Sequence, residues 1–253
     1  MTATVSGRQD EPLTPTAEGG AEPAGVAFFD VDGTLLRLTS LVSFYEYYVR
    51  DFAPVERARS LDALADLLRA DLPREEANAA YFRLIAGEPV AAMSAAGRRW
   101  FEQVLVQGFV NGAVHAQLDM HRAAGRQVVL VSGSFPACLE PIAAYLQADR
   151  VLCSRPEIAH GRYTGWIGTP MIGDAKAAAV ATVLQALPHG TPSWAYGDHG
   201  SDLPMLEQVS TPVVVGSDVA LTRLAHERGW EVLLGDGPLT AIAETVPALS
   251  RAR

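Results

Sequence analysis

The feature that most constrains the fold is the stretch from Ala27 to Leu36, where an apolar run ends in two aspartates and a glycine. The residues before Asp30 are apolar on both faces, which is typical of a strand buried inside a parallel sheet. Gly33 then marks the point where the strand ends and the backbone turns. Asp30 and Asp32 flank one residue, so a regular strand points both carboxylates to the same side. Because ligands bind at the carboxyl ends of strands in open α/β sheets, we expect a functional site here.

Two carboxylates this close repel each other, which raises the pKa of at least one unless a cation lies between them. The pair therefore favours a divalent metal site in which one acid remains free to carry a proton. Two other interpretations are an ordinary turn and a calcium loop of the EF-hand kind. A calcium loop needs an acid at its twelfth position, which is Leu41 when counted from Asp30. The choice between these interpretations depends on the residues downstream.

Composition excludes several classes of function. A chain of 253 residues, 49 % of them apolar, can bury a full core. A net charge of −9 without a run of basic residues opposes nucleic-acid binding, and no apolar run is long enough to span a bilayer. Cys138 and Cys153 are too few for a disulfide framework. Residues 1–24 are polar and lack an apolar signal segment, so we expect a disordered tail on a cytoplasmic protein.

The order of the patterns predicts an α/β core with a helical insert. Leu41, Phe44, Tyr45 and Tyr48 share one helical face, and helical patterns continue over 55–70, 74–86 and 90–107. From Ala113, helices alternate with short strands, which indicates a parallel sheet, and the pattern 157–166 predicts a hairpin turning at His160-Gly161. We expect a Rossmann-like sheet with helices on both faces. Residues 25–38 and 111–253 would form this core, and 39–110 an all-helical cap.

Polar groups follow two later strands. Ser132 comes after an apolar strand and before a helix, where a hydroxyl and free N–H groups can hold an anion, although serine is also an ordinary helix cap. Asp198 and Asp202 follow the strand pattern 193–196. They would bring a second acidic pair to the sheet edge, or would serve as an N-cap and a first-turn acid of the helical pattern 203–209.

Lys176 is the only lysine among the 20 Lys and Arg residues of the chain. A compact ammonium is kept at this position although arginine is used everywhere else. It lies near a predicted helix start, where a surface cation is slightly unfavourable with the helix dipole. A solvated surface lysine is the alternative. Taken with the acids and Ser132, its charge predicts a site for a phosphate and a hard divalent cation.

These residues carry a resemblance to a known family. The run from Phe28 to Leu35 resembles the first motif of the haloacid dehalogenase superfamily of phosphohydrolases, and residues 131–134 resemble the second. Lys176 is similar to the third motif, and residues 197–202 to the fourth, in the family's order and with the helical insert at the position of a type-1 cap. Residues 161–165 and 195–206 are similar to the phosphoserine-phosphatase-like branch.

The resemblance implies a Mg²⁺-dependent phosphomonoester hydrolase acting on a small phosphorylated metabolite. Asp30 would attack phosphorus and form an aspartyl-phosphate, and Asp32 would protonate the leaving alkoxide and then activate water. Ser132, Lys176 and backbone N–H groups would neutralise the phosphoryl oxygens. The residues implied for the remaining roles are Asp30, the Asp32 carbonyl, Asp198 and Asp202 for the metal, and Gly33, Thr34 and Gly133 for the substrate.

The identity of the leaving group depends on the insert. Phosphoserine-specific members of the family carry an acid shortly after the first motif, but residues 37–40 contain none, which disfavours free phosphoserine. His199 replaces a residue that is usually small and would face the substrate or the surroundings of the metal. Tyr45 and Arg50, together with Tyr48, Arg83 and Arg98, are candidates for lining the insert, and core packing or solvation is the alternative for each.

Two alternative functions would involve the same residues. A phosphotransferase or mutase would pass the phosphoryl group from the same aspartyl-phosphate to a second substrate. A non-catalytic phospholigand-binding module would have lost a motif, and none is missing.

Overall fold

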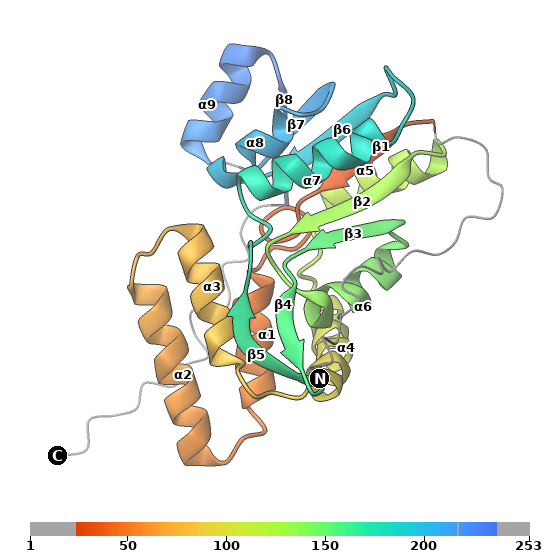
Figure 1. Ribbon diagram of the computed structural model, residues 1–253. Coiled ribbons are helices and arrows are strands. Elements are labelled where there is room, and N and C mark those ends of the chain that lie inside the picture. Colours follow the sequence, from red (N-terminus) through yellow and green to blue (C-terminus); the bar gives the residue numbers. More distant parts are fainter. Residues whose placement is uncertain (1–23, 217, 237–253) are drawn as a thin grey trace, which may run out of the picture.

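A six-stranded sheet forms the centre of the computed structural model, which describes residues 24–216 and 218–236 (Figure 1). The strand order is β3-β2-β1-β6-β7-β8, and all neighbouring strands are parallel. The strands are β1 (Val26–Phe29), β2 (Gln127–Ser132), β3 (Arg150–Cys153), β6 (Ser193–Gly197), β7 (Thr211–Val215) and β8 (Glu231–Leu233). The predicted α/β fold is confirmed. Because β1 lies in the middle, Asp30 stands at the centre of the carboxyl edge.

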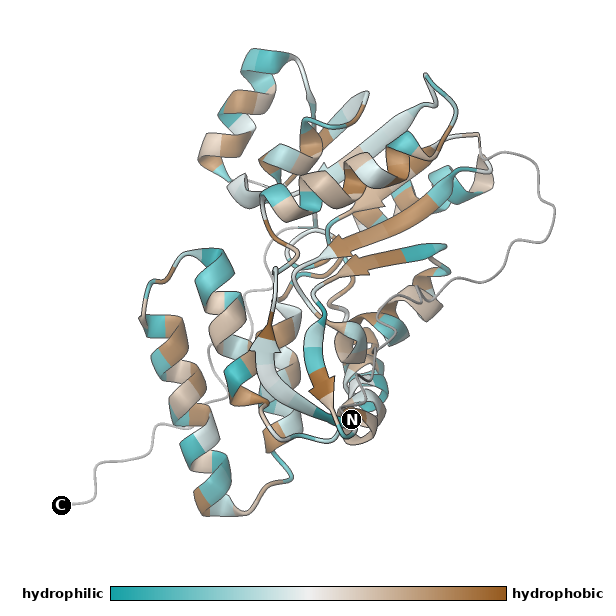
Figure 2. Cartoon of the chain, in the orientation of Figure 1, coloured by the Kyte–Doolittle hydropathy of each residue, from teal (hydrophilic) through white to brown (hydrophobic). Residues whose placement is uncertain are grey.

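Helices cover both faces of this sheet, which explains why β1 is apolar throughout. Ala27 and Phe29 pack into one apolar cluster, and Val26 and Phe28 pack into another on the opposite face. All four side chains are fully buried. The helices are α5 (Gly112–Ala123) and α6 (Pro136–Leu146) on the first face, and α7 (Asp174–Gln185), α8 (Leu203–Leu206) and α9 (Val219–Arg228) on the second. In Figure 2 strands β2 and β3, which lie beside β1 in the sheet, are largely brown.

The segment between β1 and α5 is helical, as predicted. Its helices are α1 (Ser40–Val49), α2 (Pro54–Arg69), α3 (Arg74–Leu84) and α4 (Val90–Val106). The chain enters and leaves this segment along one short ribbon, where Leu36 pairs with Val110 and the Arg37 N–H donates to the Phe109 carbonyl at 2.8 Å. We use the name helical insert for α1 to α4.

One helix of the insert, α4, is packed tightly on α6 of the core. A Cβ atom added at Gly97 would lie 1.8 Å from the Ala137 carbonyl oxygen, so only glycine permits this approach of the two helices. Beside it, Trp100 and Phe101 are buried in the cluster that also contains Leu139. The α4–α6 contact therefore fixes one side of the insert to the sheet.

The predicted hairpin is present as β4 (Pro156–Ala159) and β5 (Arg162–Ile167), with His160 and Gly161 in the left-handed region at the turn. Its position in the chain falls in the range that the sequence assigns to the core, yet it lies beside the insert (Figure 1). The Tyr163 N–H donates to the Glu88 carbonyl at 3.0 Å, and the Tyr163 side chain is buried against the insert. A sequence pattern reveals that two strands pair, but not what their shared face covers.

Several element ends differ from the sequence prediction. Helix α3 ends two residues before the end of the predicted pattern 74–86, and α8 ends at Leu206 because the chain turns there toward β7. The predicted tail lies outside the described residues except for Ala24, as does the end of the predicted core after residue 236. Within the described residues, no helix is both long and apolar enough to cross a membrane.

Candidate active site

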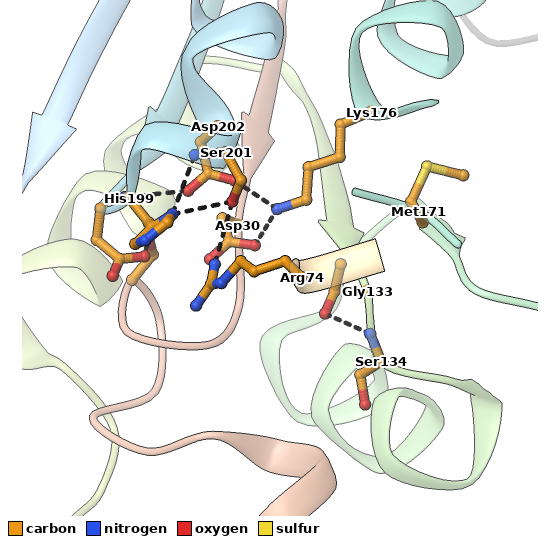
Figure 3. Close-up of polar contacts among 12 residues, drawn as sticks. Asp30, Arg74, Gly133, Ser134, Met171, Lys176, His199, Ser201 and Asp202 are labelled. Atoms are coloured by element: carbon orange, nitrogen blue, oxygen red, sulfur yellow. Dashed lines mark hydrogen bonds and ion pairs between the residues drawn. The ribbon is translucent and has the colours of Figure 1, made fainter. Parts of the chain in front are cut away.

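The first predicted carboxylate and the single lysine meet at the carboxyl edge of the sheet. Asp30 follows β1, and Lys176 extends from the first turn of α7 toward it, where its ammonium donates to Asp30 Oδ1 (Figure 3). The same ammonium donates to Asp202 Oδ1 at 2.7 Å. Lys176 is only 4 % exposed, so the interpretation as a solvated surface lysine is wrong.

Asp202 serves two structural purposes at once. One carboxylate oxygen accepts from Lys176, and the other accepts from the His199 backbone N–H at 3.2 Å. The His199 ring nitrogen Nδ1 in turn accepts from the Ser201 N–H at 3.0 Å, which completes a capping box over the short 3-10 turn Gly200–Asp202. Asp202 therefore lies at the sheet edge beside Lys176 and also belongs to the capping box of the turn before α8. The contacts of His199 hold this loop together.

Gly33 and Thr34 surround Asp198 rather than the cavity described below. The Thr34 hydroxyl donates to Asp198 Oδ1 at 2.8 Å and is fully buried. A Cβ atom at Gly33 would lie 2.2 Å from Asp198 Oδ2, and Gly33 has a φ of +85°, so the first motif needs glycine here on both counts. The two residues expected to bind substrate thus position the carboxylate of the fourth motif.

The cluster of Asp30, Asp198, Asp202 and Lys176 contains more acidic than basic groups. Burial raises the pKa of Asp30 well above its usual value; Lys176 opposes this shift, and Asp202 and Asp198 add to it. Burial and then Asp202 raise the pKa of Asp198 as well. Burial lowers the pKa of Lys176, but Asp30 and Asp202 more than offset that effect and hold it above its usual value. One ammonium among three carboxylates leaves a deficit that a cation would relieve.

The same three carboxylates have the chemistry of a magnesium site. One oxygen each from Asp30, Asp198 and Asp202 lies within 4.8 Å of the others. Oxygens bound to one Mg²⁺ at about 2.1 Å stand at most about 4.2 Å apart, so the cluster fits this ion with small side-chain movements. Carboxylate oxygens are also the hard ligands that Mg²⁺ prefers. The group could thus hold a divalent cation beside Asp30.

A cavity of about 370 Å³ opens directly onto these groups. Asp30, Asp32, Ser132, Gly133 and Lys176 all line it, so the structure brings residues of the first three motifs to a single wall. Its volume lies at the lower end of the range of about 300–1,000 Å³ for small-molecule sites.

The buried groups on this wall are available for chemistry. Asp32 Oδ1 has no hydrogen-bond partner among the described residues, and burial raises the pKa of Asp32 to about 6. Such a carboxyl group can carry a proton near neutral pH. Ser132 does not cap α6, which begins after Phe135; its hydroxyl accepts from the Ser134 N–H at 3.1 Å.

The opposite wall comes from the insert, and here the structure adds residues that sequence reasoning missed. Asn78 of α3 is buried and donates from its side-chain amide to the Gly133 carbonyl at 2.8 Å. Arg74, one turn earlier, donates to the Ser201 hydroxyl at 3.1 Å. Both line the cavity, as does Asp71 from the preceding turn. An asparagine inside a helix is unfavourable, which was the one sequence signal for Asn78.

None of the predicted lining residues of the insert reaches this cavity; these are Tyr45, Tyr48, Arg50, Arg83 and Arg98. Tyr45 is 4 % exposed and packs edge-on against Tyr81, and Arg50 lies over the Tyr47 ring and donates to Gln103 at 3.2 Å. The first turn of α1 lines the cavity, and Arg50 follows the last turn. Ten helical residues span about 15 Å, which takes Arg50 to the far end of α1.

Comparisons with known proteins find similar hydrolases and phosphatases. A model of the family described as haloacid dehalogenase-like hydrolase matches residues 27–207. The chain is 30 % identical to a Mycobacterium tuberculosis protein named "probable phosphatase", over 97 % of this chain and 86 % of the relative. It is 31 % identical to a phosphoserine phosphatase of the same species, over 81 % of this chain and 69 % of the relative. A solved structure of a Bordetella pertussis protein of unknown function has a TM-score of 0.72 and 29 % identity, covering 82 % of this chain and 97 % of that one.

Proposed function

The chain belongs to the haloacid dehalogenase-like hydrolase family and is a phosphatase, and we propose that it hydrolyses a small phosphomonoester through an aspartyl-phosphate on Asp30 with the help of Mg²⁺. The observation that carries this proposal is the shared wall of the cavity. Asp30, Asp32 and Lys176 line it together, with a second acidic pair beside them. A phosphoryl group placed there would meet a nucleophile, a proton carrier and a cation at once.

In the first half of the reaction, Asp30 attacks phosphorus and the bond from phosphorus to the ester oxygen breaks. Asp32 gives its proton to the departing alkoxide, for which a pKa of about 6 is suited. Lys176 keeps its positive charge beside Asp30 and neutralises the phosphoryl oxygens as charge spreads over them.

In the second half, the carboxylate of Asp32 takes a proton from water, and the water oxygen attacks the phosphorus of the aspartyl-phosphate. Inorganic phosphate leaves, and Asp30 and the protonated Asp32 are regenerated. Asp30, the Asp32 carbonyl, Asp198 and Asp202 would hold Mg²⁺, which supplies positive charge against the phosphoryl group when bound. Gly133 and Ser132 offer the hydroxyl and N–H groups on the other side of the phosphate.

The proposal is tested by measuring inorganic phosphate released from a panel of phosphorylated metabolites. We expect release that stops in excess chelator and returns with Mg²⁺ but not with Ca²⁺, whose looser coordination would disturb in-line attack. Asp30→Asn should abolish turnover, while Asp62→Asn, an exposed acid on α2, should match the wild type. Release of inorganic phosphate and alcohol in equal amounts would exclude a phosphotransferase, because that enzyme passes the phosphoryl group to a second substrate. Full activity in chelator would contradict the metal, and an Asp30→Asn enzyme within tenfold of wild type would contradict the nucleophile.

A further inference from the structure

The wall of the cavity that faces the sheet edge is built mainly from apolar side chains of the helical insert, most of them leucines. Leu64, Leu67 and Leu68 of α2 line it, together with Leu72 of the following turn and Leu41 of α1. The brown positions along α2 in Figure 2 stand among teal ones, as in a helix with one apolar face. The site thus has a polar wall with the reacting groups and an apolar wall opposite.

Part of this apolar wall is not covered by protein. Leu64 is 2 % exposed and belongs to the core, but Leu68 is 57 % exposed and Leu72 is 37 % exposed. A single exposed leucine is ordinary. Here the exposed side chains border the same cavity as Asp30, so a molecule that places its phosphate at Asp30 would lay its other end against them.

The charged residues of this wall do not favour a polar leaving group in its interior. Asp71 and Arg74 are both exposed to solvent, which screens their charges, and Arg74 already donates to Ser201. The first turn of α1 contributes Thr39, Leu41 and Val42, with no acid to receive an ammonium group.

We infer that the leaving group of the substrate is apolar, an alkyl or aryl alcohol bound against the α2 leucines, and that Leu68 and Leu72 determine this preference. The inference rests on the proposed phosphatase function and adds the chemical class of its substrate. Apolar surface buried from water contributes about 0.8 kcal/mol per methylene, which corresponds to about three- to fourfold in affinity.

A homologous series separates this idea from its rivals. We would measure kcat/KM with n-alkyl phosphates from ethyl to octyl, below micelle-forming concentrations, and with O-phosphoserine. The expected result is a rise of about three- to fourfold per methylene until the cavity is filled, with O-phosphoserine poorer than butyl phosphate. A flat or falling series, or a preference for O-phosphoserine, would overturn the inference while leaving the phosphatase function intact.

Variants assign the effect to the two leucines. Leu68→Gln and Leu72→Gln should flatten the series, with the largest loss of kcat/KM for the longest esters. Leu61→Gln is the matched control: Leu61 is 36 % exposed on the same helix and does not line the cavity. If kcat/KM depends on chain length as in the wild type in both test variants, or if this dependence is lost equally in the control, Leu68 and Leu72 do not determine the preference.

Binding measured without turnover distinguishes failure of the inference from failure of the function. Alkylphosphonates have no ester bond to cleave, so their dissociation constants report the apolar wall alone. We expect the same three- to fourfold gain per methylene, lost in Leu68→Gln. If no ester is hydrolysed but phosphonate affinity still rises with chain length, the phosphatase proposal fails and the apolar subsite stands. Affinity independent of chain length would overturn the subsite.

Discussion

The sheet edge and the α2–α3 pair of the insert face each other across one cavity, but they are built differently. At the edge, Asp30, Lys176 and Asp202 are at most 5 % exposed and are fixed by ion pairs to one another. In the α2–α3 pair, Leu68 and Arg74 are exposed, and α2 contributes a single buried side chain.

This difference separates chemistry from selectivity. Groups that react must keep one geometry, which burial and pairing at the sheet edge provide. Segments that admit and recognise a substrate come from the less stable parts of a protein. The α4–α6 contact holds one side of the insert in place, whereas α2 buries only Leu64. Variants at the edge should therefore affect all substrates, and variants in α2 and α3 should affect binding.

The largest expected effect comes from the edge. Lys176→Met removes the charge while keeping most of the side-chain volume, and we expect kcat to fall by about 10²–10³ for every substrate. Lys176→Arg should recover little, because a planar guanidinium is wider than an ammonium and must fit between Asp30 and Asp202. Steady-state kinetics with several esters would measure this.

The control for this experiment is Arg98→Met, an exposed cation of α4. It should stay within twofold of wild type. Because Lys176→Met leaves two buried carboxylates unpaired, circular dichroism must confirm that the variant is folded. A folded Lys176→Met enzyme with wild-type kcat would contradict the proposed role of Lys176 and the assignment of the chemistry to the sheet edge.

The fixed side of the insert is tested at Gly97. Gly97→Val places a side chain against the Ala137 carbonyl, and we expect a loss of about 1–3 kcal/mol in the free energy of unfolding from overpacking. Ala92→Val, at an exposed position of α4, is the control. Helix propensity alone favours valine over glycine and disfavours valine over alanine, so it predicts the opposite order. Denaturant unfolding in which Ala92→Val is the less stable variant would show that the two helices are not tightly packed.

The core also contains a histidine that should make stability depend on pH. His121 is 3 % exposed; its Nε2 lies 2.9 Å from the Tyr196 hydroxyl, and its Nδ1 lies 3.1 Å from an Arg126 nitrogen. Since arginine can only donate, Nδ1 is the acceptor and the ring is neutral. Burial, and then Arg126, lower the pKa of His121 to about 4.

The sign of this effect follows from proton uptake on unfolding. Between pH 6.5 and pH 4 the unfolded chain binds the proton and the folded chain does not, so the stabilisation is present above pH 6.5 and is lost as pH falls toward 4. From pH 7 to pH 5 we expect wild type to lose about 1–2 kcal/mol relative to His121→Gln. Urea unfolding of both proteins measures this. If the difference in the free energy of unfolding between the two proteins does not depend on pH, His121 is not neutral in the folded state. The substrate selectivity of His121→Gln should equal that of the wild type.

The smallest effect should come from the α2–α3 side. Asn78→Ala removes the hydrogen bond to the Gly133 carbonyl, and we expect kcat/KM to fall by up to about tenfold, mainly through KM, because α3 then holds the cavity wall less well. Glu76→Ala, exposed on the same helix, should have no effect. A fall in kcat alone with KM unchanged would mean that Asn78 belongs functionally with the sheet edge.

The positions of the polar residues at the sheet edge could be predicted from the sequence because they depend on local features. A strand apolar on both faces needs to be buried, and its carboxyl end must lie at the sheet edge where Asp30 was found. Gly33, Asp198 and Asp202 follow strands in the same way, and the single Lys176 begins a helix that returns to that edge. Parallel strands bring their carboxyl ends together whatever the rest of the chain does, so distant motifs converge.

The recognition wall could not be predicted in this way. The face of α1 that contains Tyr45 was correctly predicted to be apolar, but apolarity alone does not say whether a side chain meets the core or the cavity. Leu68 and Asn78 reach the cavity because α2 and α3 pack beside α1 and the core, and Arg50 does not because it follows the last turn of α1. This packing depends on contacts between residues far apart in the chain, such as Asn78 with Gly133 and Tyr163 with Glu88. Only the tertiary structure contains that information.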